Sequence, residues 1–160
     1  MAFLYSLCLL FPQYYQLSAY QRNTICKYER NIRTEAKKNN IEPELLASVI
    51  FVESAFRTKA VSSAGACGLT QVIPRWTGYR ETVGIKYTCQ QLKNPLTSIK
   101  VGARILGYNI RVYGKGDINK GLCFYNAGTK CLTKKGYYKR SVYVKKVNKI
   151  YNTIIGNRVL

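Results

Sequence analysis

The sequence of 160 residues contains no histidine and only seven aspartate and glutamate residues. The absence of histidine excludes Ser/His/Asp and Cys/His catalysis in their usual forms, and it removes the commonest zinc ligand. None of the six cysteines forms a CxxC pair, which argues against a zinc ribbon or a thioredoxin-like motif. An enzyme of this composition must therefore use a carboxylate or a cysteine for proton transfer.

The sequence also lacks internal repeats, low-complexity runs and any apolar stretch long enough for a conventional membrane-spanning helix. Apolar residues make up 47% of it, which is typical of a single globular domain. We assign residues 21–160 to this domain and residues 1–20 to an apolar leader. The leader resembles a secretory signal with a candidate cleavage site at Leu17-Ser18-Ala19, although it lacks an early Lys or Arg. An uncleaved anchor and an arm packed in the core are the alternatives.

Basic residues, in contrast, are abundant: 26 Lys and Arg give a formal net charge of +19. This excess predicts attraction to polyanions such as nucleic acid, anionic lipid or the acidic polymers of a bacterial envelope. A solvated basic surface would have the same composition, so charge alone does not identify the partner.

Apolar residues at three- and four-residue spacing predict a mainly helical protein, with any sheet confined to residues 77–92. Pro43 suits the first turn of one helix, and Asp117 is a candidate N-cap of another. The expected helices span 24–40, 43–56, 69–73, 95–113, about 117–128, and 141–155.

Glu53 occupies an unusual position in the helix expected over 43–56. It continues a stripe formed by Leu46, Val49 and Ile50, so its carboxyl should project among residues that pack inward. Partial burial disfavours the charged form and raises the pKa, as a general acid working near neutral pH requires. The alternative is a glutamate at a frayed helix end that reaches solvent.

The segment 59–68 consists largely of small residues and includes Gly65 and Gly68. Small side chains let the backbone approach a ligand or another packed element closely. The segment lacks the Lys-Ser/Thr ending of a phosphate-binding loop, so nucleotide binding is not expected.

Four segments, in this order, resemble the catalytic domain of soluble lytic transglycosylases in the lysozyme-like superfamily. The resemblance extends from about Ile41 to Tyr151 and also includes residues 143–147. The segments are Glu53-Ser54-Ala55-Phe56, the run 60–74 containing Gly68-Leu69-Thr70-Gln71, Asn94-Pro95 with the helix that follows, and Tyr125-Asn126-Ala127-Gly128.

The resemblance implies a lysozyme-like α+β domain with a cleft, no cofactor and no metal. It implies that Glu53 is the sole catalytic acid/base and that four residues bind the glycan: Ser62, Gln71, Tyr125 and Asn126. Tyr125 matches a tyrosine whose hydroxyl lies near the catalytic carboxylate, whereas Asn126 could instead only cap a helix end. Structural roles near the site are expected for Ser54, Gly65 and Gly68.

This chain also departs from the family pattern. Thr70 and Ile73 stand where methionines are common, at positions that help to line the floor of the cleft. These replacements put the sugar preference in doubt rather than the catalytic step.

The implied reaction cleaves the β-1,4 bond between N-acetylmuramic acid and N-acetylglucosamine without water. Glu53 would protonate the glycosidic oxygen and then deprotonate the muramic C6 hydroxyl, which leaves a 1,6-anhydro end. The nearest alternative is a hydrolase of the goose-type lysozyme kind, with Glu81 as its second acid. A non-catalytic glycan-binding protein and a basic nucleic-acid-binding protein are remoter alternatives, the latter supported by charge alone.

An even number of cysteines in a small chain favours disulfides and an oxidising compartment over free thiols. We expect Cys123–Cys131 to clamp the segment 125–128 and Cys26–Cys89 to tie an N-terminal helix to the segment before Asn94. A monomer is expected, exported to the periplasm or the exterior, or associated with a phage. Its partners would be peptidoglycan strands and anionic envelope polymers.

Overall fold

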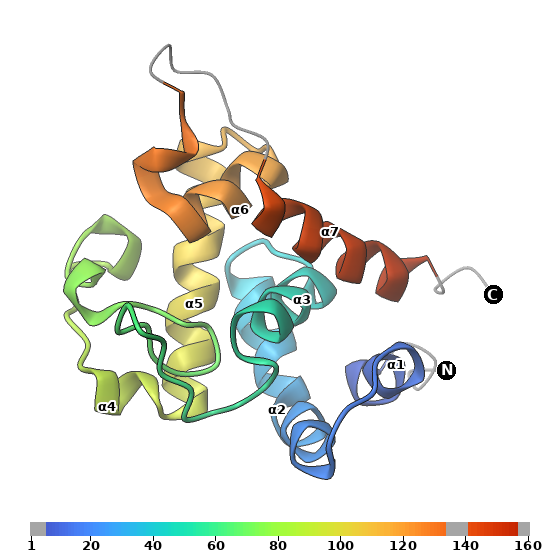
Figure 1. Ribbon diagram of the computed structural model, residues 1–160. Coiled ribbons are helices and arrows are strands. Elements are labelled where there is room, and N and C mark those ends of the chain that lie inside the picture. The colour runs from blue at the N-terminus through green and yellow to red at the C-terminus, as the bar shows by residue number, and fades with distance from the viewer. Residues whose placement is uncertain (1–5, 134–140, 157–160) are drawn as a thin grey trace.

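The computed structural model describes residues 6–133 and 141–156, and these residues are mainly helical, as expected (Figure 1). The α-helices are α1 (Leu7–Tyr14), α2 (Ala19–Lys38), α3 (Pro43–Ser54), α4 (Cys89–Leu92), α5 (Pro95–Tyr108), α6 (Ile118–Ala127) and α7 (Val142–Ile155). A π-helical turn, η3 (Asn109–Tyr113), extends α5. Short 3₁₀ turns are η1 (Pro74–Trp76), η2 (Arg80–Thr82) and η4 (Gly128–Cys131).

One local expectation was wrong. Residues 69–73 do not form a helix, because Cys67 pairs with Val72 and η1 begins only at Pro74. The difference arises from pairing across the small-residue loop, which helical periodicity does not report. Residues 77–92 contain η2 and α4. Isolated antiparallel bridges lie outside that segment, at Val61–Cys67 and Cys67–Val72.

Side-chain caps start several of the helices where the sequence predicts a start. Asn94 accepts hydrogen bonds from the amides of Leu96 and Thr97, and Asp117 accepts one from the amide of Lys120. Ser141 accepts from the amide of Val144 at the start of α7. Such caps satisfy amides that have no partner within the helix.

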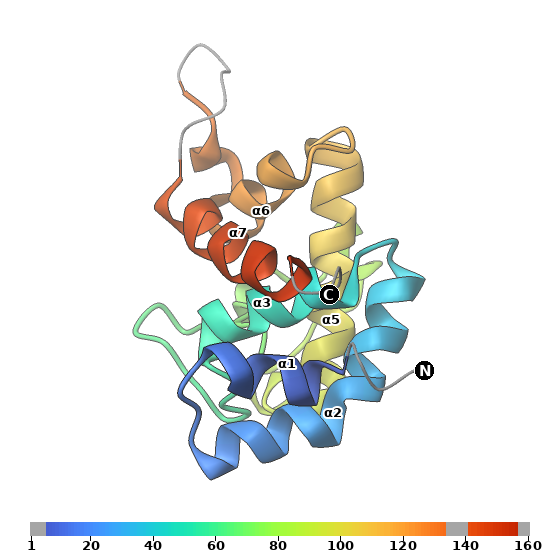
Figure 2. The ribbon, with the colours of Figure 1, turned by 90° about the vertical axis from the view of Figure 1, so that its right-hand side faces the viewer.

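Helix α3 forms the centre of the core. Leu46, Val49 and Ile50 are all fully buried there. The helix packs against α2 and α7, and Figure 2 shows it between α1 and α7. The last turn of α3 is therefore held from several sides.

Helix α1 packs into this core. Leu7 and Phe11 are fully buried, and the Phe11 ring makes edge contacts with Phe51 and Phe56, at centroid distances of 5.6 and 5.2 Å. The Glu29 carboxylate of α2 accepts hydrogen bonds from residues at the start of α1. Among the described residues no helix is both long and apolar enough to cross a membrane. Cleavage of this segment as a signal, or its use as an anchor, stays a prediction.

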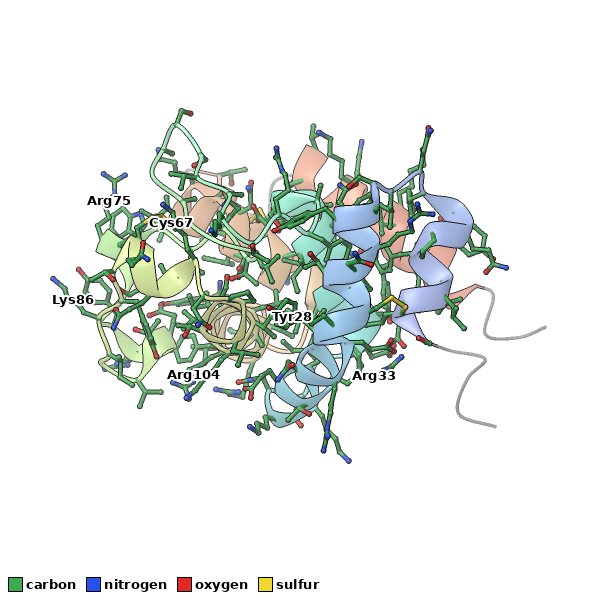
Figure 3. All side chains as sticks on the ribbon, turned by 90° about the horizontal axis from the view of Figure 1, so that it is seen from below. Tyr28, Arg33, Cys67, Arg75, Lys86 and Arg104 are labelled. Atoms are coloured by element: carbon green, nitrogen blue, oxygen red, sulfur yellow. A yellow bond between two sulfur atoms is a disulfide. The ribbon has the colours of Figure 1, made fainter. Side chains whose placement is uncertain are left out.

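All six cysteines are paired. The Cys123–Cys131 bond is confirmed, but the expected Cys26–Cys89 bond is wrong. Cys26 instead pairs with Cys8 and joins α2 to α1, and the α1–α2 disulfide is visible in Figure 3. Cys89 pairs with Cys67 and joins α4 to the small-residue loop. The error arose because the sequence does not show that α1 folds back along α2.

Candidate active site

Glu53 lies in the last turn of α3 and is partly buried, as the apolar stripe predicts. The helix ends one residue later, because Ala55 adopts a left-handed backbone conformation (φ 49°) and Phe56 does the same (φ 60°). Left-handed conformations are unfavourable for residues other than glycine, so the surrounding packing must hold this reversal. The buried Phe56 ring and a hydrogen bond from the Gln21 side chain to the Ala55 carbonyl do so.

The Glu53 carboxyl has one direct polar partner recorded among the described residues. The Tyr143 hydroxyl of α7 donates a hydrogen bond of 2.7 Å to its Oε1 atom. Burial raises the pKa of Glu53 from 4.5 to about 7, and the Tyr143 hydrogen bond opposes this rise by stabilising the charged form. A substantial fraction of Glu53 is therefore protonated at neutral pH and can act as an acid.

A second tyrosine borders the same carboxyl. Tyr125 lies on α6, and its hydroxyl donates a hydrogen bond of 2.7 Å to the Thr70 carbonyl. Burial and the Glu53 charge raise the pKa of Tyr125 above its usual value, and burial likewise raises that of Tyr143. Both phenols are therefore neutral hydrogen-bond donors next to the carboxyl.

Buried hydrogen bonds and close packing fix the loop formed by residues 60–74. Ser54 donates to the Leu69 carbonyl at 2.8 Å, which ties the end of α3 to the loop. Gly68 has φ of 79°, and a Cβ atom there would lie 1.9 Å from the Leu92 carbonyl oxygen. Only glycine fits this position. Gly65 also has a positive φ (81°) but faces open space, in keeping with a turn requirement alone.

A protein-family comparison matches residues 30–148 to the "Transglycosylase SLT domain" model. The match covers most of the chain and includes Glu53, Tyr125 and Tyr143. The chain belongs to the transglycosylase SLT domain family.

Curated relatives of this SLT domain include proteins named as transglycosylases. The chain is 32% identical over 130 residues to a membrane-bound lytic murein transglycosylase C of Actinobacillus pleuropneumoniae, covering 74% of this chain and 35% of the relative. It is 31% identical over 118 residues to a transglycosylase of Enterobacteria phage PRD1, covering 74% and 40%. The chain therefore spans about a third of the length of the first of these relatives.

Solved structures share the fold of this SLT domain. One is an inactive mutant of the lytic transglycosylase Slt from Pseudomonas aeruginosa, with a TM-score of 0.67 and 22% identity over 91% of this chain and 27% of that chain. Another is the 70 kDa soluble lytic transglycosylase of Escherichia coli, with a TM-score of 0.55 and 20% identity over 87% and 22%. At these identities the likeness establishes the fold.

The other candidate glycan-binding residues of the SLT domain lie in the loop 60–74 and in α6. The Gln71 side-chain amide nitrogen donates hydrogen bonds to the carbonyls of Ala60 and Gly68, so this side chain stabilises the loop that contains it. The Ser62 hydroxyl accepts a hydrogen bond from the Ala66 amide. Asn126 is exposed in the last turn of α6. Their contacts with glycan stay predictions.

Thr70 does not line a cleft floor as expected. It is fully buried, and its hydroxyl donates to the Ser98 carbonyl of α5 at 2.8 Å. A Cβ atom on Gly102 would lie 2.4 Å from the Thr70 side chain, so the loop and α5 approach closely here. The threonine thus fastens the carbonyl that receives Tyr125 to the underlying helix.

Glu81, the candidate second acid, lies in a different environment. It belongs to η2 and accepts a hydrogen bond of 2.8 Å from the Tyr113 hydroxyl. This contact raises the pKa of Tyr113 to about 12. Within residues 6–133 and 141–156, no cluster of three or more His, Cys, Asp or Glu side chains could hold a metal ion.

Tyr143 is the partner of Glu53 that sequence reasoning did not single out. The segment 143–147 formed part of the family resemblance, but nothing in it indicates which residue it would contact. The pairing appears only when α7 packs against α3.

Proposed function

We propose that this chain is a lytic transglycosylase that cleaves the β-1,4 bond between N-acetylmuramic acid and N-acetylglucosamine in peptidoglycan. The observation that carries the proposal is Glu53 itself, an acid with pKa about 7 that is held by a neutral tyrosine. Membership of the SLT family and the names of the relatives support the substrate.

In the first step Glu53 gives its proton to the glycosidic oxygen, and the bond from that oxygen to the anomeric carbon breaks. The substrate's own acetamido group stabilises the positive charge at that carbon. In the second step the Glu53 carboxylate takes the proton of the muramic C6 hydroxyl, whose oxygen bonds to the anomeric carbon. The product is a 1,6-anhydro ring, and Glu53 is protonated again.

The small number of carboxylates and their positions favour this reaction over hydrolysis. All seven acidic residues lie in the described ranges, yet the pKa of Glu53 is set by burial, which raises it, and by the Tyr143 hydrogen bond, which lowers it, rather than by a neighbouring carboxylate. A hydrolase needs a second carboxylate close enough to act on the same bond or its water, and such a neighbour would perturb this pKa. Glu81 instead bonds Tyr113.

We propose that the protein acts outside the cytoplasm, either exported or carried by a phage. Three disulfides require oxidising conditions to persist, which supports this location. The net charge of +19 would draw the protein to anionic envelope polymers, with an attraction that weakens as salt rises.

Mass spectrometry of muropeptides released from purified sacculi tests the proposal. We expect 1,6-anhydro products from the wild type, none from Glu53→Gln, and undiminished release by the control Glu81→Gln. Reducing muramic ends that vanish in Glu81→Gln would instead identify a hydrolase. Loss of release in Glu53→Gln with glycan binding retained also rejects a merely binding role.

A further inference from the structure

A groove lies between the end of α1, the last turns of α3, and α7. It has a volume of about 300 Å³, within the range of small-ligand sites. Figure 2 shows α1 and α7 on either side of α3. The lining combines apolar and aromatic walls with two lysines: Tyr15, Phe51, Val52, Lys146, Lys149 and Ile150.

The groove is cationic and its lining has no carboxylate. Helices α1 and α7 contain no acidic residue. The two acids of α3 are engaged elsewhere: Glu44 is only 2% exposed and lies beside Arg33, and Glu53 bonds Tyr143. Lys146 and Lys149 are both exposed. The groove is therefore suited to a ligand that carries carboxylates and small apolar groups.

The groove adjoins Glu53 along α3 and its partner Tyr143 along α7. Val52 directly precedes Glu53, and Lys146 follows Tyr143 by three residues. At 1.5 Å of rise per residue, Lys146 and Lys149 lie about 4.5 and 9 Å beyond Tyr143 along the α7 axis. A peptide of three to five residues extends roughly 10–17 Å, so one attached to a sugar at Glu53 reaches the groove.

Half of the lining comes from outside the shared family region. Tyr15, Lys149 and Ile150 all fall beyond residues 30–148, to which the family model matches. Part of the groove therefore lies outside the region that the family model matches.

We propose that this groove binds the acidic stem peptide carried by the muramic acid at the cleavage site. Lys146 and Lys149 pair with the peptide carboxylates, and the apolar wall receives its alanine methyl groups. The inference rests on the proposed function and assigns it a preference for peptide-bearing strands over bare glycan.

Calorimetry with a soluble muramyl tetrapeptide tests binding without any cleavage. The groove variant is Lys146→Gln/Lys149→Gln, and the matched control is Lys100→Gln/Lys145→Gln, which removes the same charge outside the groove. We expect about tenfold weaker binding in the groove variant and less than a twofold change in the control. The fully amidated peptide should bind all three proteins equally weakly. Absence of binding to the wild type, or equal weakening in the control, overturns the proposal.

Cleavage kinetics on two substrates provide the second test. Glycan strands that carry peptides are compared with strands stripped of them by an amidase. We expect the groove variant to raise KM severalfold on the peptide-bearing strands only. An equal rise on both substrates overturns the proposal, because it indicates general attraction to glycan. If the wild type releases no anhydro product, the proposed function fails, and the calorimetry still decides whether the groove binds the peptide.

Discussion

The Tyr143 hydroxyl and the Glu53 carboxyl, 90 residues apart in the chain, are joined by a hydrogen bond of 2.7 Å. The bond stabilises the charged form of an acid whose burial favours the neutral form. These opposed effects set the pKa near 7, where a single group can give a proton and then take one back.

The pH dependence of cleavage should report this balance. In the wild type kcat/KM should fall above about pH 7 as Glu53 ionises. Tyr143→Phe removes the hydrogen bond that lowers the pKa of Glu53, so the falling limb should move up by roughly one pH unit. Tyr113→Phe, on the Glu81 side, is the control and should leave the limb in place. A limb that stays fixed or moves down in Tyr143→Phe contradicts this role.

Stability should also depend on the charge of Glu53. Its pKa is raised from 4.5 to about 7 on folding, so its stabilising contribution is complete below pH 4.5 and is lost between pH 4.5 and 7. Glu53→Gln, which cannot ionise, should be more stable than the wild type at pH 8 by up to about 3 kcal/mol. The two proteins should differ little at pH 4. Urea denaturation at both pH values measures the difference, and a destabilised variant at pH 8 would argue against a buried charge.

Two glycines in one loop offer a matched comparison. Gly68→Ala places a Cβ atom against the Leu92 carbonyl and strains a positive φ, whereas Gly65→Ala meets only the strain. We expect about 1–2 kcal/mol of destabilisation at Gly65 and clearly more at Gly68. Thermal denaturation followed by circular dichroism measures both. Equal losses would mean that the loop does not press against Leu92.

The packing of α1 predicts a large loss of stability in Phe11→Ala. Its fully buried ring contacts Phe51 and Phe56, so removal should cost about 3–5 kcal/mol. Leu9 on the same helix is 59% exposed, and Leu9→Ala should change the free energy of unfolding by less than about 0.5 kcal/mol. Similar urea midpoints for the two variants would mean that α1 does not belong to the folded domain.

The disulfide pattern can be checked by peptide mapping of unreduced protein. The expected fragments join Cys8 to Cys26, Cys67 to Cys89, and Cys123 to Cys131. Thiol titration of the unreduced, denatured protein should find no free thiol. Replacing both Cys123 and Cys131 by serine should cost about 2–3 kcal/mol, because the unfolded chain regains the freedom of the closed loop. A fragment joining Cys26 to Cys89 would refute the pattern.

The sequence alone predicts the main helices, the Asp117 cap and the inward position of Glu53. Asn94, Asp117 and Ser141 cap helices within three residues of themselves, and the stripe that ends at Glu53 repeats within a few turns. Cap chemistry and helical periodicity act over such short stretches, so they can be read without knowledge of the fold. The ordered motifs likewise predicted the family.

Only the tertiary structure decided which distant segments meet. The contact of Tyr143 with Glu53, the pairing of Cys8 with Cys26, and the burial of Thr70 against Ser98 all join residues that are far apart in the chain. Each depends on how whole helices pack, and many sequences of the same local pattern could pack differently. The sequence thus placed a carboxyl inside the protein, and the packing of α7 on α3 gave it the partner that opposes its raised pKa.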